Sequence, residues 1–326
     1  MNRSVSRSAI AITAGALAVA AFAGPSAAAP GSAVVARDAA VTAAQSQAVI
    51  DFWTPERMRQ ATPMDHISVS SPSAIRSVPS GEPTVITGTT AAGTSDVSPL
   101  AFPSGGAAWT GGGAVVATTG RVFFTYQGRT ASCSGSAVTS ANRSTVMTAG
   151  HCVKLDGAFH TNWAFVPAYN NGNAPYGTWT ARRLLATPQW VAIEDINYDV
   201  GAAVVNSLNG ALLTDVVGGQ GIAFNQARGQ AMYAFGYPAA APYDGTRLIY
   251  CSGLVFNAFL SSGIGMTCNM TGGSSGGPWF LSFSEAAGTG VVNSVNSYKI
   301  NFFPTWMFGP YFGTDAQNVY NTAQSS

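Results

Sequence analysis

Ser275 lies in a glycine-rich octapeptide, TGGSSGGP, at positions 271–278. A serine hydroxyl is a poor nucleophile by itself, so it needs a base beside it and hydrogen-bond donors for the oxyanion that its attack creates. The surrounding glycines allow a sharp turn that can direct the amides of Gly273 and Ser275 towards one oxygen atom. We therefore predict that Ser275 is a nucleophile and that Gly273 and Ser275 form an oxyanion hole.

A base for this serine has to come from one of three histidines, His66, His151 and His160. His151 stands in the small-residue sequence TAGHC at 148–152, and a disulfide at the adjacent Cys152 would limit its drift. A general base must be held within hydrogen-bond reach of the nucleophile, so this setting favours His151. The spacing GxSxG also matches the nucleophile elbow of α/β-hydrolases, but that fold needs a histidine after the serine and none follows here.

The third residue that this chemistry needs is a carboxylate that orients the histidine and stabilises the imidazolium. Asp199 directly precedes the apolar run VGAAVV at 200–205, which would bury its carboxylate at the start of a strand. A buried carboxylate without a partner is costly, and a histidine N–H would relieve that cost. We predict Asp199 as the third residue, with Asp195 as the alternative.

Four cysteines indicate two disulfides if the chain is exported. Three pairings are open, and Cys133–Cys152 with Cys251–Cys268 is the one that closes two short loops. Each such bond would stabilise the fold by about 3 kcal/mol. A metal site of cysteines and histidines is the weaker interpretation because the sequence has no CxxC motif. We predict no metal and no cofactor.

The elements that position these residues read as short strands, at 121–126, 134–138 and 145–148 and at similar intervals further on. Many short strands over about 210 residues indicate an all-β sandwich or a pair of barrels. The tail, 315–323, reads as a helix. The net charge of +1 gives no basic excess, so nucleic acid is not an expected partner.

The N-terminal third differs from this pattern. Two arginines and an uncharged apolar stretch at 9–24 precede small residues, which predicts a signal peptide over 1–28 and secretion. The apolar stretch is short for a membrane anchor, which needs about 20 residues. Residues 29–104 hold an amphipathic stretch at 39–59 and then prolines that interrupt regular structure, so they are expected to form a propeptide or disordered leader. The peptidase domain would span 105–326.

Three sequences in the order His, Asp, Ser carry a family resemblance: TAGHC at 148–152, YDVGA at 198–202 and GSSGGP at 273–278. They resemble the trypsin/chymotrypsin-like serine peptidases, and in particular the secreted bacterial, glutamyl-endopeptidase-like branch. The resemblance covers roughly 115–326. It implies two six-stranded antiparallel β-barrels of the chymotrypsin type, with the triad between them and a short C-terminal helix.

Departures from the family pattern concern activation and specificity. Animal members usually carry Asp before the nucleophile, where it receives the new N-terminal amine, and Ser274 stands there. Asn269 occupies the position that is acidic in enzymes cutting after Arg or Lys. The histidine of glutamate-specific relatives is missing from GVVNSV at 290–295. We expect a neutral substrate pocket near Asn269, Met270, Asn293 and Ser294.

Together these observations predict a secreted, monomeric serine endopeptidase that acts on proteins or peptides through an acyl-enzyme, made as a zymogen and without a stable membrane anchor. The alternatives are a catalytically inert binding protein of the same fold and an esterase using the same triad. All three triad positions are intact, which disfavours the inert protein.

Overall fold

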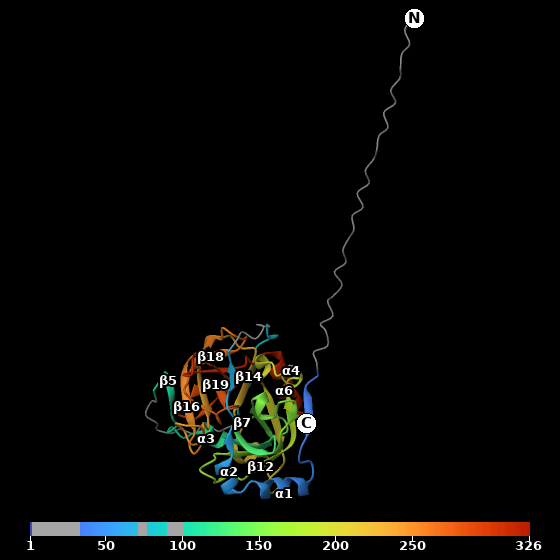
Figure 1. The fold of residues 1–326 in the computed structure, drawn as a ribbon, viewed down its shortest axis with the longest axis vertical. Helices are drawn as coiled ribbons and strands as arrows, with labels where there is room; N and C mark the ends of the chain where they lie inside the picture. Colours follow the sequence, from blue (N-terminus) through green and yellow to red (C-terminus); the bar gives the residue numbers. More distant parts are fainter. Residues whose placement is uncertain (2–32, 71–76, 90–100) are drawn as a thin grey trace. The chain divides into compact units, whose positions relative to one another are not determined.

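Six antiparallel strands close into a barrel in the first half of the computed structural model, which describes residues 1, 33–70, 77–89 and 101–326 (Figure 1). Strand order is β12-β11-β6-β7-β8-β13, and β12 also pairs with β13, which closes the ring. The strands are β6 (Thr119–Tyr126), β7 (Arg129–Val138), β8 (Thr145–Thr148), β11 (Thr161–Pro167), β12 (Trp179–Ala186) and β13 (Gly201–Val205). The predicted signal peptide lies outside the described residues.

The second half of the chain forms two further sheets. A seven-stranded sheet contains β14 (Gly221–Phe224), β15 (Ala231–Gly236), β16 (Ile249–Leu254), β19 (Pro278–Ser284) and β20 (Thr289–Val295), flanked by β4 (Thr84–Ile86) and β5 (Ser104–Ala108). A five-stranded sheet contains β17 (Phe256–Asn257), β18 (Ile264–Thr267), β22 (Trp306–Gly309), β21 (Tyr298–Ile300) and β3 (Ile67–Val69). The predicted all-β class is confirmed.

Helices are short and few in this fold. The last one, α6 (Thr314–Gln324), buries Ala316, Val319, Tyr320 and Ala323, which recur at the spacing of one helix face. Its Tyr320 hydroxyl donates to the carbonyl of Thr139 over 2.8 Å, which ties the C-terminal helix to the barrel. The other short elements of the two halves are α3 (Ala114–Thr118), η1 (Gly150–Cys152), β9 (Lys154–Leu155), β10 (Ala158–Phe159), α4 (Pro188–Ile193), η2 (Ile196–Tyr198) and α5 (Leu213–Val217).

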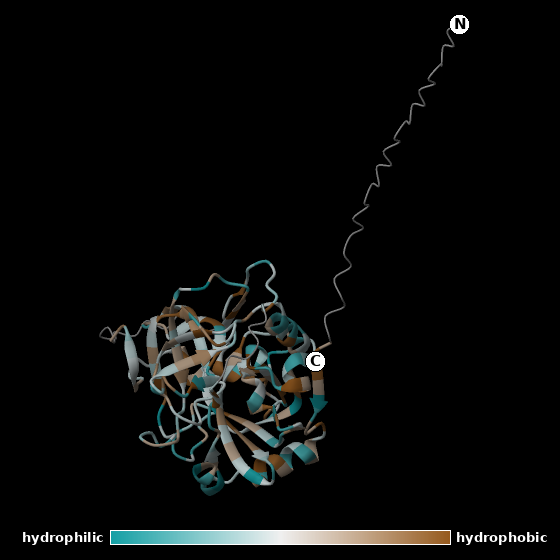
Figure 2. Cartoon of the chain, turned by 45° about the horizontal axis from the view of Figure 1, so that its top comes forward, coloured by the Kyte–Doolittle hydropathy of each residue, from teal (hydrophilic) through white to brown (hydrophobic). Residues whose placement is uncertain are grey.

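Both disulfides are the ones that loop length favoured: Cys133 is bonded to Cys152, and Cys251 to Cys268. All four residues are fully buried within hydrophobic clusters. Figure 2 shows hydrophobic and hydrophilic residues interspersed along the helices and strands rather than segregated along the chain. Within the described residues, no helix is both long and apolar enough to cross a membrane.

The leader, residues 29–104, contains short helices and strands among its described residues. It contributes β1 (Val35–Asp38), α1 (Ala43–Phe52), α2 (Pro55–Gln60), β2 (Thr62–Pro63), β3 and β4. The helices begin at Thr42 and Thr54, whose side chains accept hydrogen bonds from backbone N–H groups of the first turn. The sequence suggested an amphipathic stretch here, and the structure divides it into two helices at Trp53.

Packing holds this leader on the rest of the chain. The buried Trp53 ring contacts the ring of Phe123 in β6, and its indole N–H donates to the carbonyl of Asn162 over 2.6 Å. Strand β1 extends the first barrel by pairing antiparallel with β12, and β4 pairs antiparallel with β14. Residues 33–326 form one compact unit, so the described part of the leader belongs to the same body as the strands.

Candidate active site

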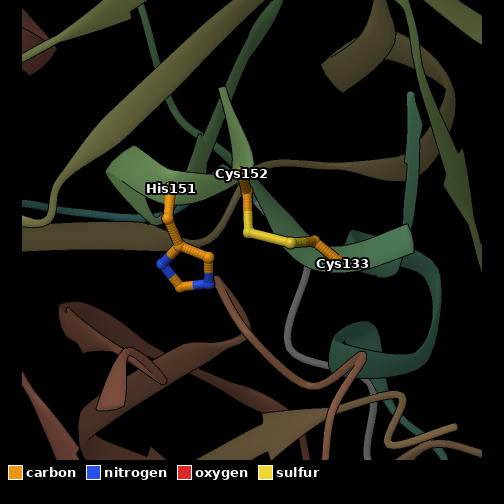
Figure 3. Close-up of side chains that lie close together, drawn as sticks. All are labelled: Cys133, His151 and Cys152. Atoms are coloured by element: carbon orange, nitrogen blue, oxygen red, sulfur yellow. A yellow bond between two sulfur atoms is a disulfide. The ribbon is translucent and has the colours of Figure 1, made fainter. Parts of the chain in front are cut away.

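His151 lies in η1, directly after β8, and it is fully buried. The neighbouring Cys152 is bonded to Cys133 in β7, so a covalent link holds the histidine turn against the barrel wall, as Figure 3 shows. His160 supports the same turn: its ring stacks on Phe124 at 4.2 Å, and its Nε2 donates to the His151 carbonyl over 2.9 Å. Burial lowers the pKa of His160 to about 4, so His160 stays neutral and acts as a support.

Asp199 follows η2 and is also fully buried. Its Oδ1 accepts the backbone N–H of His151 over 2.7 Å, and its Oδ2 lies 2.7 Å from His151 Nδ1. Because a carboxylate only accepts, Nδ1 carries a proton, so in the neutral ring Nε2 is the nitrogen that can accept one. The alternative, Asp195, instead caps η2 by accepting from the backbone and side-chain N–H groups of Asn197 over 3.0 and 2.7 Å.

Ser297 is a partner of Asp199 that the sequence did not reveal. Its hydroxyl donates to Asp199 Oδ2 over 2.6 Å, so this carboxylate accepts three hydrogen bonds. Ser297 stands 98 positions away in the chain and outside every motif, so only the fold brings the two together. These three hydrogen bonds compensate for the burial of the carboxylate group.

Ser275 occupies the turn before β19 and is fully buried. Its carbonyl accepts the N–H of Ser134 over 2.7 Å, next to the cysteine that is bonded to the histidine turn. Gly276 follows with a φ of +79°, and a Cβ there would lie 2.0 Å from Thr148 Oγ1, so only glycine fits. Ser275 Oγ and His151 Nε2 are both buried, and neither has a hydrogen-bond partner among the described residues.

The backbone N–H of Gly273, the predicted oxyanion donor, already has a hydrogen-bond partner in the full-length chain. Its N–H donates to the carbonyl of Met64, a leader residue, over 2.8 Å. Gly273 has a φ of +92°, a conformation that favours glycine. An N–H that binds a peptide carbonyl here can bind the same oxygen once it becomes negatively charged.

The four residues predicted for the substrate pocket differ in exposure and in their hydrogen-bond partners. Asn269 is exposed, and its Oδ1 accepts from the Tyr243 hydroxyl over 2.6 Å, while Met270 is buried in the core of the second half. Asn293 and Ser294 donate to the carbonyls of Ala223 and Pro310, both over 2.8 Å. The side chains of Asn293 and Ser294 therefore stabilise the fold of the second half.

Lys299, on β21, is a charged residue near the site that sequence analysis did not single out. Its Nζ donates to the carbonyls of Cys268 and Pro304, over 3.2 and 2.5 Å. Burial lowers its pKa to about 8. It also lies near enough to His66 for its charge to lower the pKa of that histidine.

A metal centre does not fit the donor set of this site. Among the described residues, the cluster of potential ligands is Cys133, His151 and Cys152. The two cysteines are joined in a disulfide, so neither offers the thiolate that binds a metal.

Comparisons with known proteins identify the family. No family model matches the chain. The structure of the protease Anisep from Arthrobacter nicotinovorans is 50% identical in sequence, with a TM-score of 0.61, and the match covers 65% of this chain and 97% of that one. The thermostable serine protease AL20 from an extremophilic microorganism is 44% identical, with a TM-score of 0.62 and coverage of 65% and 99%.

Two other matches are weaker evidence for the family. A Glu endopeptidase shares the fold at 16% identity and a TM-score of 0.54, over 68% of this chain and 98% of that one. A protein of Bacillus subtilis (strain 168) named extracellular metalloprotease is 36% identical over 70 residues, which are 21% of this chain and 22% of that protein. The chain thus spans about a fifth of the length of this relative.

The chain belongs to the bacterial chymotrypsin-like serine proteases, which are hydrolases. The family resemblance and the enzyme class predicted from the sequence are therefore confirmed.

Proposed function

We propose that the chain is a secreted serine endopeptidase in which His151, Asp199 and Ser275 form the catalytic triad. The observation that carries this proposal is the fully buried pair of His151 and Asp199, in which Nδ1 faces the carboxylate and Nε2 has no hydrogen-bond partner among the described residues. A neutral imidazole with a free lone pair is the base that a serine nucleophile needs.

In this mechanism the Ser275 hydroxyl attacks the carbonyl carbon of a peptide bond while His151 Nε2 takes its proton. The oxyanion receives the N–H groups of Gly273 and Ser275. His151 then gives the proton to the leaving amine, and water hydrolyses the acyl-enzyme by the same route in reverse. Asp199 stays ionised throughout and stabilises the imidazolium, and Ser297 and the His151 backbone N–H hold it in place.

The proposal includes a zymogen. Ser275 is fully buried and Gly273 is engaged by the leader, so the chain must lose residues 29–104 before a substrate can bind. The body of the enzyme would then begin near position 105, because β5 starts at Ser104 and pairs with β16. Residues 1–28 would be removed on export. N-terminal sequencing of the secreted Ser275→Ala chain tests this first cut, and sequencing of the processed enzyme tests the second.

Activity is tested with a fluorophosphonate, which reacts with an activated serine, followed by a peptide library and a panel of short-chain esters. We expect the secreted enzyme to be labelled and to cleave peptides. Ser275→Ala should abolish both, lowering turnover by a factor on the order of 10⁴ to 10⁶. Ser282→Ala, an exposed serine on β19, is the matched control and should retain full activity. Labelling that survives Ser275→Ala would refute the assignment, and cleavage of esters without cleavage of peptides would make the chain an esterase.

A further inference from the structure

Residues 62–69 of the leader run through the site between the two halves of the chain. Strand β2 pairs with β7, and Met64 continues this contact by donating its N–H to the Ser132 carbonyl over 2.9 Å. The Met64 carbonyl then accepts the N–H of Gly273 over 2.8 Å. Beyond it, β3 pairs with β21 of the second half. One short segment therefore contacts the first barrel, the oxyanion donor and the second half in turn.

Both of these strand pairings are parallel. Thr62 and Pro63 lie opposite Ala131 and Ser132, on the side of the site where β7 is bonded through its cysteine to the histidine turn. Residues 67–69 lie opposite 298–300, on the side of β21. The leader thus enters on the His151 side and leaves along β21.

The proposed chemistry requires the opposite direction for a substrate. His151 must protonate the nitrogen that leaves, so the part of a substrate that follows the cleaved bond has to lie on the histidine side. The part that precedes the bond then lies along β21. In the leader, the nitrogen that follows the Met64 carbonyl belongs to Asp65, and the chain continues from there towards β21. The carbonyl is in position for the oxyanion donor, but its leaving nitrogen faces away from the general acid.

The side chain of His66 also binds the segment to the turn that contains Ser274 and Ser275. Its Nε2 lies 3.0 Å from the hydroxyl oxygen of Ser274. That hydroxyl already donates its proton to the Thr271 carbonyl over 2.8 Å, so His66 is the donor in this pair. Ser274 is the residue that replaces the usual Asp, and in this chain it receives a leader side chain.

Further along, Val69 is buried in a hydrophobic cluster with Ile196, Tyr298 and Ile300. The Val69 carbonyl accepts the N–H of Asn301 over 3.3 Å, and the Ser68 hydroxyl donates to the side chain of Asn301. Backbone pairing, a buried side chain and a polar contact thus fix this end of the segment on β21.

From this arrangement we infer that residues 62–69 inhibit the unprocessed chain by binding in the active site in the direction opposite to a substrate. The segment binds the oxyanion donor next to the fully buried Ser275, and its direction would keep Ser275 from cleaving it. That the segment inhibits the enzyme rests on the proposed peptidase function. The direction in which the segment binds does not depend on that function, so direction and inhibition are tested separately.

Direction is tested by disulfide cross-linking in the full chain carrying Ser275→Ala, which cannot process itself. Six residues of extended chain span about 20 Å, so Ser68 and Thr62 cannot both reach Asn301. We expect the pair Ser68→Cys with Asn301→Cys to form a disulfide under mild oxidation, and the pair Thr62→Cys with Asn301→Cys to remain reduced, as read by peptide mass spectrometry. Cross-linking of the Thr62 pair would show the substrate direction and overturn the inference, as would the absence of a cross-link in both pairs.

Inhibition is tested in chains with native Ser275 by comparing fluorophosphonate labelling of the full-length band with that of the processed band. We expect the full-length wild-type chain to react at least about 100-fold more slowly than the processed enzyme. His66→Ala should accelerate labelling of the full-length band about tenfold, whereas the exposed control Ser70→Ala should not change it. Equal labelling of the full-length and processed wild-type chains would overturn the inference. If the processed enzyme itself is not labelled, the proposed function fails while the cross-linking result stands.

Discussion

Asp199→Asn changes one atom in the proposed triad, and the contacts of Asp199 determine its effect. Oδ1 accepts a backbone N–H, which cannot be turned round, so the new NH₂ group is excluded from that position. It must occupy the position of Oδ2, which lies 2.7 Å from His151 Nδ1. An amide N–H facing a ring N–H is repulsive, so the histidine is driven to the other tautomer, with its proton on Nε2. In that form Nε2 can no longer accept the proton of Ser275.

The expected loss follows from the cost of using the wrong tautomer. We expect kcat/KM to fall by a factor on the order of 10⁴, equivalent to about 5.5 kcal/mol of transition-state stabilisation. Ser297 also loses an acceptor, because its hydroxyl donates to the oxygen that the amide replaces. That hydroxyl can rotate and accept from the amide, so the fold should persist.

The assay is steady-state cleavage of a peptide substrate by the processed variant, with the circular dichroism spectrum and melting temperature as checks on folding. Asp195→Asn is the matched control: it makes the same change four positions away, at a carboxylate that caps η2. We expect the control to retain activity within about threefold, since an asparagine oxygen can cap η2 as the carboxylate does and no catalytic contact changes. If Asp199→Asn keeps more than a tenth of the activity, or if the control shows the larger loss, the acid has to be reassigned.

Three other expectations follow from the same contacts. Burial holds the pKa of His66 well below its usual value of 6.5, and the charges of Lys299 and His151 lower it further. Protonation therefore opposes leader binding, which is complete above pH 6.5 and weakens as the pH falls below it. Hydrogen exchange of residues 62–69 in the Ser275→Ala chain, corrected for intrinsic rates, should be faster at pH 5 than at pH 7.5, and His66→Gln should remove the difference. Replacing both cysteines of the 133–152 pair, or both of the 251–268 pair, by serine should lower the free energy of unfolding by about 3 kcal/mol in urea titrations of the Ser275→Ala chain. Only the 133–152 change should also lower kcat strongly, because that bond holds the histidine turn; equal losses of kcat would contradict this role. Chelators should leave peptidase activity within about twofold, since the sulfurs beside His151 form a disulfide, and a loss that added zinc restores would refute the metal-free mechanism.

Local sequence predicted the residues whose chemistry depends on local turns. The turn around Ser275 needs its glycines whatever the remainder of the fold does, and Cys152 lies directly beside His151. The 199–205 run combined a carboxylate with a buried strand, and the structure brings that carboxylate to His151. The all-β class followed in the same way from many short strands.

Residues placed by long-range pairing could not be predicted in this way. The pairing of β19 with β20 is irregular between Trp279 and Phe280, so the side of the sheet that Asn293 and Ser294 face cannot be read from strict alternation. The leader strands β2 and β3 have two and three residues, too few to show a period, and their partners stand more than 60 positions away. Prolines therefore suggested irregular structure where the chain forms strands against other strands.

Three leader strands cover open backbone edges of the body: β4 pairs with β14, β3 with β21, and β1 with 183–186 of β12, where β11 does not pair with β12. Loss of the leader would leave backbone groups on all three partners without their strand neighbours, and unpaired edges invite association between molecules. A protein that folds with these edges covered and then loses the cover has no simple route back after denaturation. The working lifetime of the processed enzyme would then depend on how slowly it unfolds rather than on an equilibrium between folded and unfolded chains.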